Sequence, residues 1–117
     1  MNTVILTGNL SSDVELREVG EDKRLATFRL AVDRGGKNDE ADFFRITVWD
    51  RQAELCADYL AKGRKVGIEG RLRYRTWEDE GQKRSAVDVV AHRVEFLSPP
   101  PGQSAEVVPF EAATAAA

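Results

Sequence analysis

Apolar and polar residues alternate with a period of two along several stretches of the chain, which is the pattern of half-buried β-strands. In residues 24–33, for example, Phe28 and Leu30 fall on one face and Arg29 on the other. Alternation and β-rich composition predict five strands, at 2–10, 24–33, 42–50, 65–77 and 84–97. Polar segments that contain glycine, at 34–41 and 78–83, are typical of loops between strands.

One stretch follows the period of a helix instead. Apolar residues recur at three- and four-residue spacing from Ala53 to Leu60, which predicts a helix over 51–62 with Asp50 as its N-cap and Gly63 as its stop. Three strands, one helix and two further strands is the order of an OB-fold. The predicted fold is therefore all-β, a five-stranded OB-fold barrel with one capping α-helix between the third and fourth strands.

The chain changes character near its end. Residues 1–97 carry the whole strand and helix pattern and are predicted to form one domain. From Ser98 a proline-rich run leads into an alanine-rich end, so residues 98–117 are expected to form a flexible tail.

Composition narrows the classes of function. The chain is 42% hydrophobic and 32% charged, and it has no apolar run of the roughly 20 residues that a membrane span needs. Its first residues carry no basic leader and Cys56 is its one cysteine, which favours a cytoplasmic protein. One cysteine and one histidine cannot make a standard zinc site, so no metal or cofactor is expected. No carboxylates cluster for catalysis, so no enzyme activity is expected.

The strand faces that point away from the predicted core give the most information about function. In one strand this face holds Phe43, Arg45, Thr47 and Trp49, and in the next it holds Arg71, Arg73, Arg75 and Trp77. Aromatic rings stack on unpaired bases for about 1–3 kcal/mol each, and guanidinium groups neutralise phosphates. The pattern predicts binding of single-stranded nucleic acid.

The opposite assignment of faces stays open, because a shift of one residue would turn both tryptophans inward. That shift would also bury four arginines, which is costly. On the favoured assignment Leu72 and Tyr74 face the core. Three further basic residues are candidate phosphate contacts: Arg51, Lys62 and Lys65. The net charge of −3 argues against nucleic acid, but the segment 62–75 holds six basic residues against one acidic residue.

Three stretches resemble the bacterial single-stranded-DNA-binding protein family: MNTVILTGNLSSDVELR, FFRITVWDRQAELCADYLAKGRKVGIEGRLRYRTWED and GQKRSAVDVVAHRVEFL. The resemblance covers about residues 1–97. It implies an OB-fold homotetramer that wraps single-stranded DNA during replication, repair and recombination, without sequence preference. It places stacking aromatics at Phe43, Trp49 and Trp77, and phosphate contacts near Arg45, Arg51, Arg73 and Arg75.

The chain departs from the family pattern at three places. The loop from Arg34 lacks the family's further tryptophan, and Thr3 stands where a basic residue is common. The family's acidic tip, which ends in Pro-Phe and docks on partner enzymes, is replaced by Pro109-Phe110 followed by seven residues. Recruitment of replication and repair proteins through the tail is therefore in doubt.

Two further expectations concern assembly. A free edge on the first strand could pair with a second copy, which predicts a homo-oligomer. The acidic charge and the missing loop aromatic leave open an alternative function, an OB-fold protein-interaction module of a replication-restart assembly.

Overall fold

The structure, a computed structural model, describes residues 1–36, 38 and 40–98. Its elements in chain order are β1 (Val4–Leu10), β2 (Glu15–Glu18), β3 (Arg24–Asp33), β4 (Ala41–Trp49), α1 (Asp50–Tyr59), β5 (Lys65–Asp79) and β6 (Gln82–Phe96). The expected tail, residues 98–117, lies outside the described residues except for Ser98.

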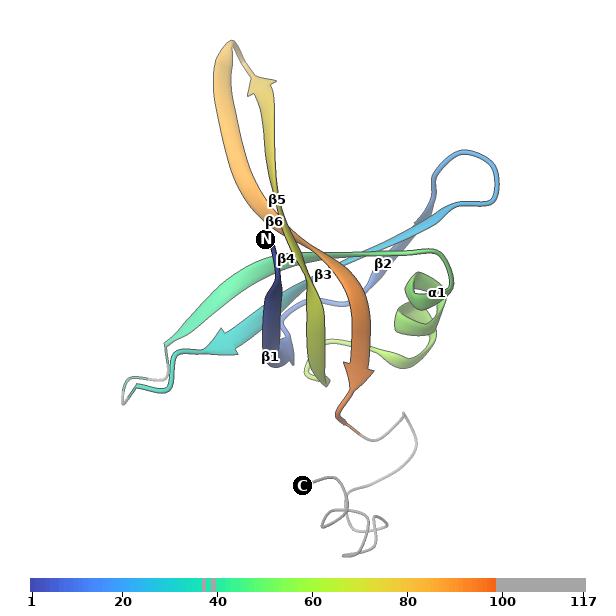
Figure 1. Cartoon of the computed structure of the whole chain (residues 1–117), viewed down its shortest axis with the longest axis vertical. Helices are drawn as coiled ribbons and strands as arrows, with labels where there is room; N and C mark the ends of the chain where they lie inside the picture. The colour runs from blue at the N-terminus through green and yellow to red at the C-terminus, as the bar shows by residue number, and fades with distance from the viewer. Residues whose placement is uncertain (37, 39, 99–117) are drawn as a thin grey trace, which may run out of the picture.

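Five strands close into a ring, and they are the five that the sequence predicts. The sheet order is β1-β5-β6-β4-β3, and β1 also pairs with β3, which closes the barrel. The helix α1 follows β4, the third strand of the ring, as expected for an OB-fold (Figure 1). The prediction of an all-β barrel with one helix is confirmed.

A sixth strand, β2, was not predicted. Its four residues read ELRE, all are exposed, and they pair in antiparallel register with the outer edge of β3. A short polar strand carries no alternation of apolar residues, so periodicity could not find it. It widens the β3–β4 sheet outside the ring.

The core fills the barrel and the space under the helix. Phe28, Leu30, Ile46 and Ile68 are buried there with Cys56 of α1. The helix is also tied to β6, because the side-chain amide of Gln52 donates to the carbonyl of His92 and accepts from the N–H of Val94. The core faces predicted for β3 and β4 are correct, but Thr47, predicted on the outward face of β4, is also buried.

Two glycines allow the barrel to close tightly. A Cβ at Gly8 would lie 2.2 Å from the carbonyl oxygen of Ala31, and one at Gly70 would lie 2.1 Å from that of Val90. Gly8 sits where β1 leaves its pairing with β5 and meets β3. The interior glycine of the first strand thus marks a close approach of two backbones, a role glycine often has in strands.

Beyond Gly70, β5 and β6 leave the barrel as a two-stranded arm, which is the tall hairpin at the top of Figure 1. On β6 the base of the arm still joins the core, since Val89 opposite Leu72 is fully buried, but on β5 Leu72 and Tyr74 are 41% and 67% exposed. Their predicted core position is wrong. The arm turns at Glu80 and Gly81, both at positive φ as a two-residue hairpin turn requires. The loop expected over 78–83 is therefore only two residues long.

The predicted helix ends also need correction. The N-cap is Trp49 rather than Asp50, it makes no side-chain cap bond, and the helix ends at Tyr59. Asp50 has a φ of 59°, so the chain turns sharply between β4 and α1. Gly63 lies in the turn before β5, where its N–H donates to the carbonyl of Leu10. The C-cap Leu60 is already extended, with a φ of −106°, so the helix ends earlier than its apolar spacing suggests.

Candidate nucleic-acid interface

The outward face of β3 and β4 is built of rows set by strand register. Trp49 lies opposite Leu25, Thr47 opposite Thr27, Arg45 opposite Arg29, and Phe43 opposite Ala31. Directly paired residues in an antiparallel sheet share a face. The rows therefore place Phe43, Arg45 and Trp49 on one side of the sheet, as the sequence predicts, while Ile46 and Val48 face the core.

The two aromatics of β4 differ in accessibility. Phe43 is 59% exposed, whereas Trp49 is half-buried beside Leu25 and is not part of the core cluster. They are six residues apart on one strand, a distance of about 20 Å at about 3.3 Å per residue. Trp49 can therefore offer only part of its ring, and Phe43 is the open platform of this sheet.

A groove of about 700 Å³ runs between this sheet and the arm. Its lining includes Phe43 and Arg45 from β4, Arg29 from β3, and Arg75 and Asp88 from the arm. Three of the predicted site residues, Phe43, Arg45 and Arg75, thus meet in one groove. Arg29 was not predicted, because only the pairing of β3 with β4 brings it beside Arg45.

The charge of the groove is balanced rather than strongly basic. Its three arginines face three carboxylates, those of Asp13, Glu15 and Asp88. Asp88 is 3% exposed and its carboxylate pairs with the guanidinium of Arg75. Its charge is therefore already matched inside the protein.

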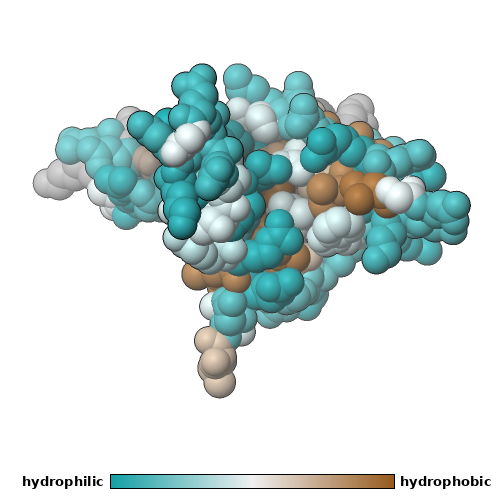
Figure 2. All heavy atoms as spheres, turned by 90° about the horizontal axis from the view of Figure 1, so that it is seen from above, coloured by the Kyte–Doolittle hydropathy of each residue, from teal (hydrophilic) through white to brown (hydrophobic). Residues whose placement is uncertain are grey.

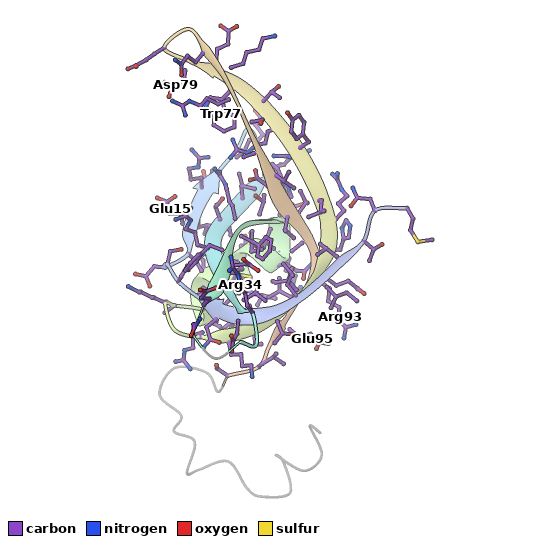
Figure 3. The ribbon with its side chains drawn as sticks, turned by 90° about the vertical axis from the view of Figure 1, so that its left-hand side faces the viewer. Glu15, Arg34, Trp77, Asp79, Arg93 and Glu95 are labelled. Atoms are coloured by element: carbon purple, nitrogen blue, oxygen red, sulfur yellow. The ribbon has the colours of Figure 1, made fainter. Side chains whose placement is uncertain are left out.

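The arm carries the second exposed tryptophan. Trp77 is 39% exposed, and the guanidinium carbon of Arg75 lies 4.6 Å from the centroid of its ring. Trp77 on the arm and Glu15 on β2 lie on the same side of the molecule, opposite Arg93 and Glu95 (Figure 3). The arm therefore extends the outward sheet face with one more aromatic ring.

Five other predicted residues lie outside the groove. Arg71 and Arg73 are exposed on the base of the arm, and Arg51 is exposed in the first turn of α1. Lys65 opens β5, twelve residues from Trp77 and so about 40 Å away along the strand. Lys62 lies nearer to the groove, since its backbone N–H donates to the carboxylate of Asp13, a groove residue, at 2.9 Å. The structure does not bring these five together.

Surface colouring shows how polar the molecule is around the arm. Viewed from above, hydrophilic residues cover most of the face, and hydrophobic residues gather near its middle and to the right (Figure 2). Among residues 1–36, 38 and 40–98, no group of His, Cys, Asp and Glu could hold a metal ion. That part of the chain also has no helix of the length and hydrophobicity needed to cross a membrane.

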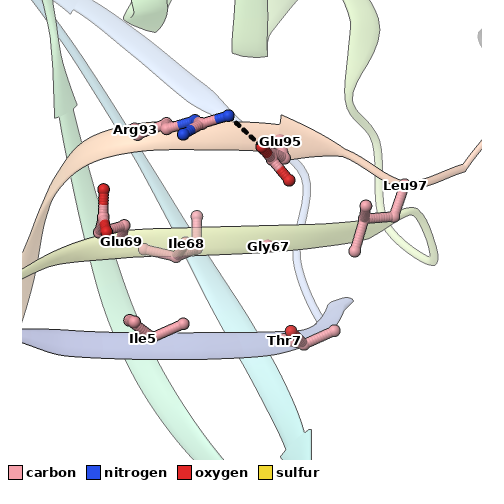
Figure 4. Close-up of a pocket in the computed structure, with 8 residues that line it drawn as sticks. All are labelled: Ile5, Thr7, Gly67, Ile68, Glu69, Arg93, Glu95 and Leu97. Atoms are coloured by element: carbon pink, nitrogen blue, oxygen red, sulfur yellow. Dashed lines mark hydrogen bonds and ion pairs between the residues drawn. The ribbon is translucent and has the colours of Figure 1, made fainter. Parts of the chain in front are cut away.

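A second, smaller hollow of about 200 Å³ lies on β1, β5 and β6 (Figure 4). Ile5, Gly67 and Leu97 line it together with the ion pair between Arg93 and Glu95. Ile5 is 70% exposed and Leu97 is 47% exposed. Sequence reasoning did not single out this face, because isolated apolar residues at exposed positions give no periodic signal.

Comparison with known proteins finds relatives over most of the chain. Residues 1–97 match the model of the single-strand binding protein family. The single-stranded DNA-binding protein of Treponema pallidum is 40% identical over 102 residues, a match that covers 83% of this chain and 58% of that protein. The protein of that name from Clostridium tetani is 46% identical over 103 residues, covering 83% and 70%. That from Bacillus cereus is 44% identical over 104 residues, covering 85% and 61%. The matched segments thus span between 58% and 70% of these relatives, and the resemblance seen in the sequence is confirmed.

Proposed function

The chain belongs to the single-strand binding protein family, and we propose that it binds single-stranded DNA without sequence preference in replication, repair and recombination. The observation that carries the proposal is the groove lined by Phe43, Arg45 and Arg75, with the exposed ring of Trp77 farther out on the same arm. Rings supply stacking to any base, since every base has a π face, and cations beside them meet the phosphates. Base edges are not read by this chemistry, so sequence has little effect.

The groove supports stacking more strongly than electrostatics. With three carboxylates beside three arginines, few phosphates can be neutralised there. We therefore expect a shallow salt dependence, in which each phosphate contributes about −0.7 to the slope of log K against log salt. No reaction is assigned, and the protein acts by binding DNA in the cytoplasm, at the nucleoid.

The test is competition between nucleic acids. Fluorescein-labelled oligo(dT) should bind the full chain and be displaced equally by unlabelled single strands of other base composition. A duplex of the same length should compete far less well, because its bases are not free to stack. Equal competition by the duplex would contradict the proposal.

We further propose that the protein works as a homotetramer. Within the described residues, β1 pairs with β3 only through Asn9 and Leu10, so the edge from Val4 to Gly8 is free on that side. The adjoining face carries Ile5 and Leu97, both exposed. A free edge and an apolar face suit pairing with further copies. Light scattering should give about four times the chain mass of 13.0 kDa, and a monomer mass would refute the proposal.

The alternative of a protein-interaction module has one favourable observation, the balanced charge of the groove. It predicts capture of a protein partner at high salt with no dependence on DNA, and no displacement of labelled oligo(dT). The tail with Pro109-Phe110, which bears on recruitment of replication and repair proteins, lies outside the described residues.

A further inference from the structure

Two arginines face each other directly across neighbouring strands of the outward sheet. Arg29 of β3 and Arg45 of β4 are register partners, and both are exposed. Directly opposed residues have their Cβ atoms about 4.5–5.5 Å apart, and like charges in such positions destabilise a sheet. The fold therefore carries an unfavourable pair at this position.

The carboxylates of Asp13 and Glu15 line the same groove, but neither forms an ion pair with Arg29 or Arg45. Arginines elsewhere hold carboxylates, as Arg34 does with Asp42 and Glu40 at 2.8 Å each. No ion pair within the described residues includes Arg29 or Arg45. Both therefore keep donors that an anion could accept.

The backbone holds the pair in place. The N–H of Arg29 donates to the hydroxyl of Ser12, and its carbonyl accepts from the N–H of Ser11, at 2.9 and 2.8 Å. Both arginines line the groove, and Phe43 lies two residues from Arg45 on the same face. A ring thus sits about 7 Å along the strand from the cations.

We propose that Arg29 and Arg45 together hold one phosphate of single-stranded DNA, beside a base stacked on Phe43. The proposal rests on the proposed function and adds to it a role for Arg29 and the number of phosphates, one, that the two arginines hold. Each guanidinium offers several N–H donors in a planar fork, which suits the oxygens of a phosphate. The bound anion also cancels the repulsion between the two cations. DNA binding therefore removes an interaction that destabilises the free protein.

The first test measures affinity and its salt dependence for oligo(dT), using Arg29→Gln, Arg45→Gln and the double variant. Either single variant should raise Kd roughly tenfold at low salt, as loss of a charge-assisted hydrogen bond would. The double variant should change the slope of log K against log salt by about 0.7, the value for one phosphate. Lys23→Gln is the control, because it removes one exposed charge at the β2–β3 turn, away from the groove.

The outcomes separate this proposal from the function itself. An unchanged Kd for Arg29→Gln while the wild type binds tightly would overturn the role of Arg29. A slope change of about 1.4 in the double variant would show two separate phosphates and overturn the sharing. Failure of the wild type to bind oligo(dT) would instead contradict the proposed function.

A second test needs no DNA. If the two cations repel each other, Arg29→Gln should raise the unfolding temperature of the free protein by about 1–4 °C at low salt. The difference should vanish at high salt, because screening removes the repulsion. An unfolding temperature equal to or below that of the wild type at low salt would overturn the repulsion on which the shared site depends.

Discussion

The guanidinium carbon of Arg75 lies 4.6 Å from the centroid of the Trp77 ring, while the carboxylate of Asp88 holds the same guanidinium from the other strand of the arm. Asp88 is 3% exposed, so this acid is fixed inside the protein. A cation over an aromatic face stabilises that ring position. We therefore expect Arg75 to position Trp77, rather than to neutralise a phosphate as the resemblance implies.

Replacing Asp88 by asparagine tests this division of roles. Asp88→Asn should free the charge of Arg75 for a phosphate, so the slope of log K against log salt should steepen by about 0.7 on oligo(dT). Glu80→Gln, which removes an exposed acid at the tip of the same arm that forms no ion pair within the described residues, is the control and should leave the slope unchanged. A slope in Asp88→Asn identical to that of the wild type would argue that Arg75 already contacts phosphate.

The exposed rings should carry most of the affinity. Phe43→Ala and Trp77→Ala should each weaken binding of oligo(dT) by about 1–3 kcal/mol, the value of one stacked base. Phe96→Ala is the control, since Phe96 is 40% exposed but contacts Tyr59 near the end of β6. Gel-shift titrations compare the three variants, and equal losses in all of them would remove the special role of the outward face.

Barrel closure depends on the missing side chain of Gly8. Gly8→Ala would place a Cβ 2.2 Å from the carbonyl oxygen of Ala31, so the backbones must separate. We expect a loss of about 1–3 kcal/mol in the free energy of unfolding, as for other overpacked sites. At Gly67 the nearest atom to such a Cβ is 3.7 Å away, on Leu97. Gly67→Ala should therefore be neutral or slightly stabilising in the same denaturation experiment.

Burial raises the pKa of the Cys56 thiol to about 12, against an ordinary value of 9.0. The folded chain then holds this proton more tightly than the unfolded chain. Its contribution to stability is complete below about pH 9 and is lost as pH rises toward 12. Denaturant titrations at about pH 8 and about pH 11 should show a smaller loss for Cys56→Ala than for the wild type. Equal losses would mean that the thiol does not contribute.

Periodicity predicted the five barrel strands and the helix because each of them puts one face on the core. It could not show where the core ends. The alternation that correctly buries Val66 and Ile68 continues to Leu72 and Tyr74, but after Gly70 the strand has left the barrel. The alternation of apolar and polar residues is the same on both sides of this glycine, so the sequence does not show that the strand leaves the barrel there.

The parts of the site that the sequence missed are those made by pairing between strands. Arg29 looks like any exposed strand residue until register sets it against Arg45. Likewise, Asp88 and Arg75 are thirteen residues apart, and only the folded arm joins them. The aromatics, by contrast, could be found from single strands, because each stands out on a face of its own strand.

The central claim is that outward rings stack on unpaired bases, and tryptophan fluorescence tests it directly. Trp49→Phe leaves Trp77 as the only tryptophan, since the chain has two. Titration of this variant with oligo(dT) should quench its emission to a saturating level, because the ring stacks on a base. Emission from Trp77 that stays constant while labelled oligo(dT) binds would contradict the account.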